Sequence, residues 1–559
     1  MNKSKSTRVK IPSLQKWSGI FEGEFVGNIF ATKAIDLGRS KSKVAIGDSQ
    51  SAVAISTTLS NLTMPVAFLR TKADGTDRYW ANAGKLFKTT GADPESGWAQ
   101  DALGSTPSAP LYDLIEFSSD LYVPTDTDIA CMHSGTWTPA WWSVQSGAAA
   151  LQAGKPHRFA ISLAALMITD GCYVHTWDGT IATQNALTLP TQFQAQFIIG
   201  AADIAFIGTK SLNAGNAEVF SWDRSNDTYT SRYDIGDSEC LAGFLGAGIP
   251  YIITKKGEIK RFTGQGFQTV QKFPSAEIPA VINNIDPNGV TVDGNNVRIM
   301  VDFGTIGYQR LRSGLWIYEM DSNNLYHAGS IKNNAGKDYG QQELAGAGAV
   351  RLTLPGSGRY LIGGRAYTAY PSSSVYGIYT LDEAASANRG YFITPKMKSG
   401  DVRRFWRLLF VRFANIASAT DRIRVAFRTL DSTVLPAFET ITWVDATHFT
   451  GVNADVAVGD FVEILAGDNA GALAKITAIA PGSPNTYTID LTVNASTAAA
   501  RAMYMRFIDL GTVTAQGIQE QVFKPMVRSN WIQFLVELRG GINSPQVEEL
   551  IADGADVPF

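Results

Sequence analysis

Acidic residues are the first side chains in this chain whose types and spacing could do chemistry. Asp126 and Asp128 lie two positions apart, and Asp178 follows in a WDGT segment. Hydrolysis of a glycoside needs two carboxyl groups roughly 5 to 10 Å apart. These aspartates stand beside Thr and Gly, however, and aspartates in such segments usually accept hydrogen bonds from the backbone of their own turn. We therefore expect the three carboxylates to stabilise turns.

No nucleophile or metal set accompanies these acids in the sequence. There is no G-x-S-x-G segment and no phosphate-binding glycine loop, and the five histidines include no pair spaced four apart. The three cysteines, Cys131, Cys172 and Cys240, are too widely spaced for a disulfide framework or a zinc site. The sequence therefore predicts that the protein is not an enzyme and has no cofactor and no metal.

Arginine is the charged residue with the clearest pattern. Residues 401–428 contain seven arginines and two aspartates. In RIRVAFR, side chains alternate on a strand, so Arg422, Arg424 and Arg428 share one face. Such a row can contact DNA phosphates in a channel, or it can pair with carboxylates of neighbouring strands or subunits, such as Glu549. We expect pairing, and DNA contact remains the alternative.

Trp141 and Trp142 are adjacent in the segment TPAWW. Neighbouring side chains on a strand face opposite sides, so at least one ring could be exposed at an interface. An exposed tryptophan can stack on a sugar, which makes this pair the candidate for a carbohydrate- or receptor-binding surface. The more common arrangement is one ring in the core and one at a protein interface.

The elements that must position these residues repeat along the chain. Each unit is an apolar run, a Gly or Asp turn and a strand with one aromatic anchor, and the anchors are spaced 40 to 63 residues apart. A period in this range is typical of β-propellers, whose blades are four-stranded sheets. We predict about seven blades in residues 64–384, after an N-terminal arm and first strands in residues 1–63. The anchors are Phe87, Trp137, Trp177, Trp222, Phe262, Trp316 and Tyr379.

The pattern changes after the last repeat. Residues 385–431 and 503–559 contain apolar strands typical of a β-sandwich, and residues 432–502 interrupt them. Inside the interruption two alternating segments flank a GDNAG turn, which is typical of a small, five-stranded SH3-like barrel. The stretch from Gly459 to Gly471 is similar to a KOW motif. The predicted fold class is all-β: a propeller of about seven blades, then a sandwich with an inserted SH3-like barrel.

Composition narrows the function classes. The net charge of −3 and the pI near 6.0 give no attraction of the whole chain for nucleic acid. No run of 18 apolar residues predicts a transmembrane helix. The basic N-terminal sequence MNKSKSTRVK lacks the apolar segment of a secretory signal.

The order of these modules resembles a known family. A basic arm leads into blades without a catalytic set, and the sandwich opens with RGYFITPKMKSGDVRRFWRLLFVRF and ends with SPQVEELIADG. This layout resembles the tail nozzle proteins of short-tailed bacteriophages (tail tubular protein B, or tail hub) over most of residues 40–559. The SH3-like insertion is a departure from that family.

The resemblance implies a structural virion protein located in the phage tail. Such a protein forms a homohexameric nozzle for genome ejection, contacts portal and adaptor proteins, and is a docking platform for tail fibres or spikes. Its contact with double-stranded DNA is transient and non-specific. The alternative is a carbohydrate- or receptor-binding β-propeller of the virion, and a propeller glycoside hydrolase is a third, which needs a convergent acid pair.

Overall fold

The computed structural model consists almost entirely of antiparallel β-strands. In the described part of the chain the 3₁₀ turn η3 (Pro287–Gly289) accompanies the strands, and no helix there is long and apolar enough to cross a membrane. The structure describes residues 6–10, 31–33, 35–36, 45–46, 48–52, 67–72, 77–82, 84–90, 99–101, 103, 111–273, 282–303, 314–329, 359–369, 373–386, 389–398, 403–414, 416, 421–430, 435–466, 469, 472–494, 499–514, 519–540 and 545–556.

Six four-stranded antiparallel sheets follow one another through the described residues of the first two thirds of the chain, and each pairs its strands in chain order. The first three sheets are β6 (Phe68–Thr71), β7 (Asp77–Asn82), β8 (Lys85–Thr90) and β9 (Ala99–Asp101); β10 (Ile115–Phe117), β11 (Asp120–Pro124), β12 (Ile129–His133) and β13 (Thr136–Thr138); and β14 (Phe159–Ser162), β15 (Ala165–Asp170), β16 (Tyr173–Trp177) and β17 (Ala182–Thr188).

The next three sheets have the same meander order. They are β18 (Phe193–Gly200), β19 (Ala205–Ser211), β20 (Glu218–Trp222) and β21 (Ser231–Asp234); β22 (Cys240–Gly246), β23 (Ile249–Thr254), β24 (Glu258–Phe262) and β25 (Phe267–Lys272); and β26 (Val290–Asp293), β27 (Asn296–Val301), β28 (Gly314–Glu319) and β29 (Asn324–Gly329). Tight hairpins make this order possible. Between β22 and β23, for example, Ala247 and Gly248 have φ angles of 48° and 80°, as a type I′ turn requires.

The aromatic anchors mark a fixed place in these sheets. Five of the seven lie on the third strand, namely Phe87, Trp177, Trp222, Phe262 and Trp316. Trp137 lies instead on a fourth strand, β13, opposite Met132 of β12. Tyr379 belongs to a different kind of sheet, described next. The sequence repeat is therefore the repeat of one antiparallel sheet, and the described part is propeller-like.

A three-stranded sheet follows the six among the described strands. It contains β30 (Arg359–Ala369), β31 (Ser373–Ser386) and β5 (Asp48–Ala52). The N-terminal region thus supplies β5, which pairs antiparallel with β31, and β30 contacts β6 of the first sheet. The last repeat is consequently joined to residues that precede the first one.

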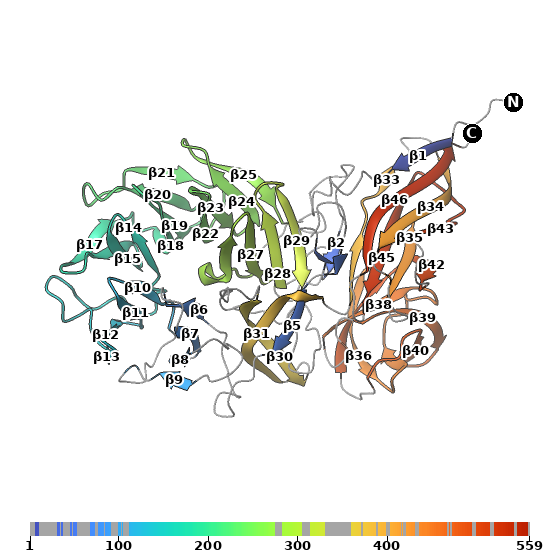
Figure 1. Ribbon diagram of the computed structural model, residues 1–559, viewed down its shortest axis with the longest axis horizontal. Coiled ribbons are helices and arrows are strands. Elements are labelled where there is room, and N and C mark those ends of the chain that lie inside the picture. Colours follow the sequence, from blue (N-terminus) through green and yellow to red (C-terminus); the bar gives the residue numbers. More distant parts are fainter. Residues whose placement is uncertain are drawn as a thin grey trace.

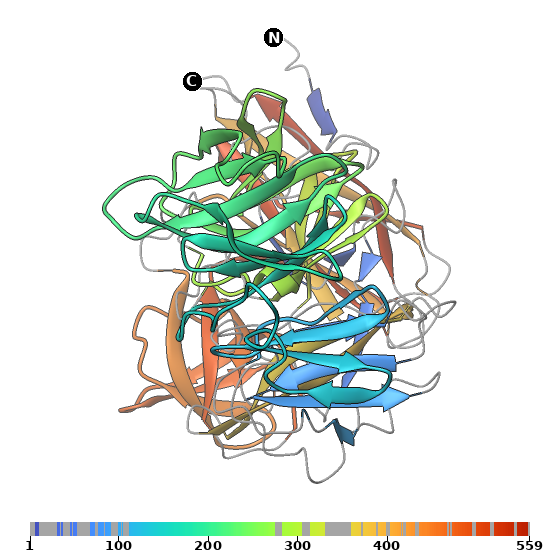
Figure 2. The same cartoon turned by 90° about the vertical axis from the view of Figure 1, so that its left-hand side faces the viewer.

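Neighbouring sheets of the propeller-like part pack through hydrophobic clusters. Between the third and fourth sheets, for example, Val174, Ile207 and Phe220 are fully buried in one cluster. Close packing also requires glycine at places, because a Cβ on Gly208 would lie 2.2 Å from the ring of Phe197. Figure 2 shows the first two sheets in blue and cyan below the green sheets of the third to fifth repeats.

Two sheets form the second part of the molecule (Figure 1). One contains β1 (Ser6–Lys10), β46 (Gln546–Asp556), β34 (Arg404–Ala414), β43 (Glu520–Phe523) and β44 (Val527–Ser529). The other contains β2 (Ala31–Lys33), β32 (Arg389–Ile393), β45 (Trp531–Arg539), β35 (Arg422–Arg428), β42 (Ile508–Val513) and β33 (Met397–Lys398). A short pair, β3 (Ile35–Asp36) and β4 (Ala45–Ile46), forms a separate sheet, and β4 contacts β45 and β46, one strand of each sheet.

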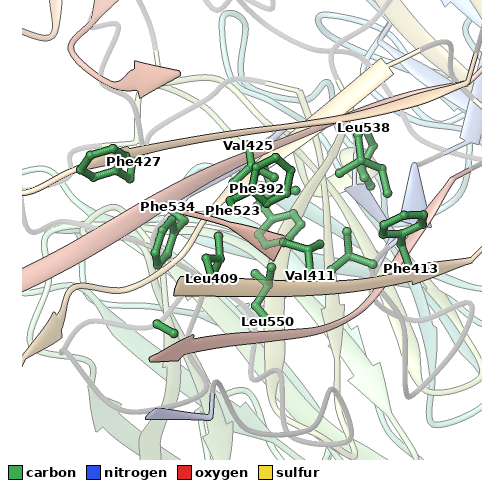
Figure 3. Packing of buried hydrophobic residues seen from close by; sticks show 14 of the residues in the cluster. Phe392, Leu409, Val411, Phe413, Val425, Phe427, Phe523, Phe534, Leu538 and Leu550 are labelled. Carbon is green, nitrogen blue, oxygen red and sulfur yellow. The ribbon is translucent and has the colours of Figure 1, made fainter. Parts of the chain in front are cut away.

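The two sheets share one hydrophobic core (Figure 3). Leu409 and Val411 of β34 and Leu550 of β46 face Val425 of β35 and Phe534 of β45. All five side chains are at most 1% exposed. Inward residues alternate along β34 on either side of a bulge between Trp406 and Leu408.

The insertion forms a closed barrel in its described residues. Its strands are β36 (Ala437–Trp443), β37 (His448–Gly451), β38 (Phe461–Ala466), β39 (Leu473–Ala480), β40 (Asn485–Ile489) and β41 (Ala499–Met505), paired in the order β36-β37-β40-β39-β38-β41. The barrel has six strands, whereas the sequence predicted five. The sixth arises because β36, which precedes the KOW-like stretch, pairs with the return strand β41 from Ala437 to Thr442.

The barrel packs on the face of the second sheet that points away from the shared core. Tyr391, Ala426 and Leu535 of that sheet are buried in one cluster with Phe461 and Met503 of the barrel. β35 is therefore buried on both faces along its five central residues. This corrects the half-buried strand expected from the alternation of RIRVAFR, because a separate module covers the polar face.

Candidate functional site

The central residue of the arginine row of β35, Arg424, lies beneath the barrel. Arg424 is 7% exposed, and its Nη2 lies 2.8 Å from Asp490 Oδ2 and 2.9 Å from Asp509 Oδ2. Asp490 follows β40 of the barrel, whereas Asp509 belongs to β42 of the sheet. The guanidinium also lies over the ring of Phe461, 4.7 Å from its centroid. One cation thus joins the sheet to the barrel.

The acidic partner Asp509 receives a second cation, since Lys475 Nζ lies 2.9 Å from its Oδ2. Burial raises the pKa of Asp509, but the hydrogen bonds from Arg424 and Lys475 outweigh burial and hold that pKa below its usual value. The carboxylate is therefore ionised and shared between a sheet arginine and a barrel lysine.

Arg539 makes a second connection beside the first. Its Nε lies 2.5 Å from Glu537 Oε1, and its Nη2 donates to the carbonyl oxygen of Leu473 in β39, 2.7 Å away. Glu537 is 2% exposed, and burial raises its pKa to about 7, while Arg389, Arg424 and Arg422 act in the opposite direction. We call Arg424, Asp490, Asp509, Glu537 and Arg539 the barrel clamp.

The other two arginines of the row occupy the ends of β35. Arg428 is half-buried, donates from Nε to Gln533 Oε1 at 2.6 Å and lies over the ring of Phe507. Arg422 is half-buried opposite Arg539. DNA or intersubunit contact is wrong for Arg424, because its burial and its two carboxylates leave no surface for another molecule. For Arg422 and Arg428 that contact stays a prediction.

A second charged cluster lies in the propeller-like part and joins sheets far apart in the sequence. Arg158, which precedes β14, places Nη2 2.7 Å from Asp286 Oδ2 in the turn before β26. Arg70 of β6 places Nη2 3.1 Å from Asp113 Oδ1, in the segment before β10. These two pairs connect the third sheet with the sixth and the first with the second.

An asparagine joins the two ion pairs. Asn288 of η3 is 3% exposed, donates from Nδ2 to the carbonyl oxygen of Tyr112 at 2.8 Å, and accepts a hydrogen bond from Arg70. Asp113 Oδ2 in turn accepts from the backbone N–H of Phe159, 3.1 Å away. We call Arg70, Asp113, Arg158, Asp286 and Asn288 the hub.

The hub links two carboxylates, Asp113 and Asp286, through one network of hydrogen bonds. Each carboxylate accepts from an arginine, and Asp113 also accepts from the backbone N–H groups of Leu114 and Phe159. Such pairing fixes geometry, and buried charges are stable in proteins only when paired in this way. The arrangement therefore fits a tie between four sheets.

Of the carboxylates singled out in the sequence, Asp178 stabilises its own turn, as predicted, whereas Asp126 and, in part, Asp128 accept from backbone N–H groups of other loops. Asp126 Oδ1 accepts from Gly154 N at 2.7 Å, and Asp128 Oδ1 accepts from the backbone N–H groups of residues 129 and 142 at 2.8 and 2.9 Å. Asp178 Oδ1 accepts from two backbone N–H groups of its own turn, and these bonds hold its pKa below the usual value. The three aspartates therefore act within turns and loops.

The tryptophan pair lies at the junction of the second and third sheets. Trp142 is fully buried, donates from Nε1 to the carbonyl oxygen of Ala149 at 3.0 Å and stacks on His175. Trp141 is half-buried, and its ring meets Tyr122 and Trp177 edge-on at 5.0 and 4.9 Å between centroids.

An exposed interface role is thus wrong for Trp142. The reason is local, because β13 ends at Thr138 and the rest of TPAWW does not continue as a strand. The backbone N–H groups of both tryptophans point to the carbonyl oxygen of Ile129. The rule of alternating faces does not hold in a turn. For Trp141, which keeps part of its surface exposed, an interface role stays a prediction.

No group of three or more His, Cys, Asp or Glu residues within the described ranges could hold a metal ion. The three cysteines are unpaired thiols. Burial raises the pKa of Cys131 and of Cys240 to about 12.

Sequence reasoning missed the hub and Glu537. Arg158 and Asp286 are 128 residues apart, and no motif links them. The segment DPNG at residues 286–289 is a turn signal, but it carries no indication of a buried partner. Glu537 stands in the apolar run WIQFLVELR, where a charge inside an otherwise buried strand was the available signal.

Comparison with known proteins finds solved structures of low similarity. No family model matches the chain, and no curated protein matches it. Among solved structures, the propeller domain of Cps50 (Swd1) from Myceliophteria thermophila is 11% identical, with a TM-score of 0.40, over 59% of this chain and 98% of that one. U3-55K is 10% identical, with a TM-score of 0.39, over 60% and 100%.

The extracellular domain of a putative hybrid two-component system from B. thetaiotaomicron is 12% identical, with a TM-score of 0.39. That likeness covers 77% of this chain, but the chain spans only 45% of that protein's length. At these TM-scores the likenesses carry nothing about activity or partners.

Proposed function

We propose that this protein is a structural subunit of the tail of a short-tailed bacteriophage, of the tail nozzle class. In this proposal the subunits assemble into a hexameric ring around a channel for genome ejection, below portal and adaptor proteins, and carry fibres or spikes on the outside. The order of the modules along the sequence motivates the proposal.

The observation that supports this proposal most strongly is that two clusters of buried ion pairs join the modules of the molecule. The clamp ties the barrel to the sheet, and the hub ties four sheets of the propeller-like part together. Removing one partner from such a buried pair is costly, so both clusters hold each module in one orientation. A rigid block of several modules is what a wall of a channel requires.

The finer architecture belongs to the same proposal. The six four-stranded sheets and the three-stranded sheet completed by β5 are the seven blades of one propeller. The two sheets around the shared core are a β-sandwich, interrupted by the barrel. β5 closes the ring, because it brings a strand from before the first blade to the last one.

Charge also fits a channel through which DNA slides. Tight binding to DNA requires Lys and Arg that neutralise phosphates and release counterions. The net charge is −3, and Arg424 at the centre of the arginine row is occupied by two carboxylates. The proposal therefore includes transient, non-specific contact with double-stranded DNA.

The test is the mass of the purified full chain by sedimentation velocity over a range of concentrations. A subunit of 60.3 kDa should form a discrete closed oligomer, six-fold by resemblance. As a control, Arg412→Met replaces an exposed, weakly paired arginine and should leave the mass of the oligomer unchanged. A protein that stays monomeric at every concentration and with its neighbours from the same particle would overturn the proposal.

A further inference from the structure

At the outer edge of the first of the two C-terminal sheets, β46 pairs with β1, a strand from the opposite end of the sequence. β1 pairs antiparallel with β46 over five residues, from Ser6 opposite Ala555 to Lys10 opposite Ile551. On its other side β46 pairs with β34. β1 therefore covers a strand edge that would otherwise expose unpaired backbone groups.

The connection from β1 to the rest of the molecule is long. Lys10 ends β1 and Ala31 begins β2, which lies in the other sheet beside β32. The 20 residues between them can span about 70 Å when extended. That is nearly three times the radius of gyration of about 24 Å expected for a compact chain of this length.

Charge makes β1 and β46 complementary. Residues 1–10 contain four basic and no acidic residues, whereas β46 contains four acidic and no basic residues. Asp553 of β46, which stands opposite Arg8, also pairs with Arg407 of β34. The acidic residues of β46 are Glu548, Glu549, Asp553 and Asp556.

The outer edge of β46 lies where a strand of a neighbouring subunit can reach it. β1 and the end of β46 lie at the far end of the two-sheet part, away from the propeller-like part (Figure 1). A strand that reaches this edge from a second copy makes the same ladder as a strand from its own chain. Exchange of an identical element between copies is a low-cost route to an oligomer.

We propose that the outer edge of β46 is the docking site for β1 of a second copy of this chain, so that each subunit donates its basic strand to the next. This inference rests on the proposed function, because it requires an oligomer. It goes further by naming the two strands that join neighbouring subunits.

The test uses two variants that each carry one new cysteine at a paired position, Ser6→Cys and Ala555→Cys. Cross-strand partners have Cα atoms close enough for a disulfide. The two variants are co-expressed with different tags, purified through both tags and oxidised with copper phenanthroline. Non-reducing gels then show whether a covalent dimer forms between the two tagged chains. The wild-type chain, oxidised in parallel, controls for the native Cys172, which is half-buried.

The expected result is a covalent dimer that contains both tags. The out-of-register pair Lys10→Cys with Ala555→Cys should give much less, because Lys10 stands opposite Ile551. The proposal is overturned if no mixed dimer forms in an oligomeric preparation while the double variant, Ser6→Cys with Ala555→Cys in one chain, closes its disulfide within a monomer. In that case the proposed function survives. A preparation that sediments only as a monomer overturns the function and the strand exchange together.

Discussion

Replacement of Arg424 by methionine tests the barrel clamp directly. The side chain of Arg424 is 8% exposed and faces Asp490 and Asp509 at 2.8 and 2.9 Å. Methionine keeps an unbranched stem of similar length against Phe461, so the substitution removes charge more than volume. The two carboxylates would then lose their common partner in a region shielded from water.

The expected loss in the free energy of unfolding depends on the partners that Asp490 and Asp509 retain in the variant. Removing one partner of a buried ion pair costs about 3 to 5 kcal/mol. Asp509 keeps Lys475 Nζ at 2.9 Å, and Asp490 keeps the backbone N–H of Lys475 at 2.7 Å. We therefore expect the lower end, about 3 kcal/mol. The control is Arg412→Met, since Arg412 is 55% exposed and 3.8 Å from Glu549, where a pair contributes about 0 to 1 kcal/mol.

The assay is hydrogen exchange of the full chain, read by mass spectrometry at β39 and β42. A loss of about 3 kcal/mol corresponds to roughly 100-fold faster exchange through opening of these strands. Exchange in the sheets of the propeller-like part serves as an internal reference and should not change. If Arg424→Met and Arg412→Met accelerate β39 and β42 equally, the clamp does not hold the barrel and the reasoning fails.

Four further predictions test other parts of the structure. The pKa of Glu537 is raised from 4.5 to about 7 in the folded protein. Its contribution to the free energy of unfolding is therefore fully present below about pH 4.5 and is lost as pH rises to 7. Glu537→Gln should remove at most about 3 kcal/mol of the pH dependence of unfolding, measured between pH 4 and 8. An unchanged pH profile would contradict the buried position of this carboxyl. Trp142→Ala should cost about 3 to 5 kcal/mol in thermal unfolding and Trp141→Ala clearly less, because only the first ring is fully buried; equal losses would contradict this difference. Arg158→Met should destabilise the propeller-like part by about 3 kcal/mol, measured by limited proteolysis, and wild-type resistance would exclude a role of the hub as a tie. Gly208→Ala should cost about 1 to 3 kcal/mol by the same thermal assay, since its methyl group meets a phenylalanine ring; a neutral effect would show that the ring moves aside.

The sequence predicts those parts of the fold that rest on local pattern. The aromatic anchors recur because five of the antiparallel sheets place a large side chain on their third strand, as Trp222 of β20 and Trp316 of β28 show. The turn aspartates were predictable for the same reason, because Asp178 acts on residues two and three positions away. Alternation also indicated the strand β35, and an apolar, aromatic run indicated β34.

Contacts between modules could not be predicted from such patterns. Arg424 stands on the polar face of an alternating strand, and only the docking of a barrel made from later residues buries that face. The pair of Arg158 with Asp286 depends on the segments before β14 and before β26 lying close together. The sequence could not tell which ring of the tryptophan pair is buried, because the chain does not continue as a strand there. In each case the residue is positioned by contacts that a local sequence pattern does not reveal.

The central claim is that this chain is a rigid subunit of a ring. Electron microscopy of the purified full chain tests it most directly, since class averages show both symmetry and the placement of the barrel. The account predicts closed rings with a central channel and with the barrel in one fixed orientation in every subunit. Single particles without ring symmetry, or rings in which the barrel takes many orientations, would contradict it.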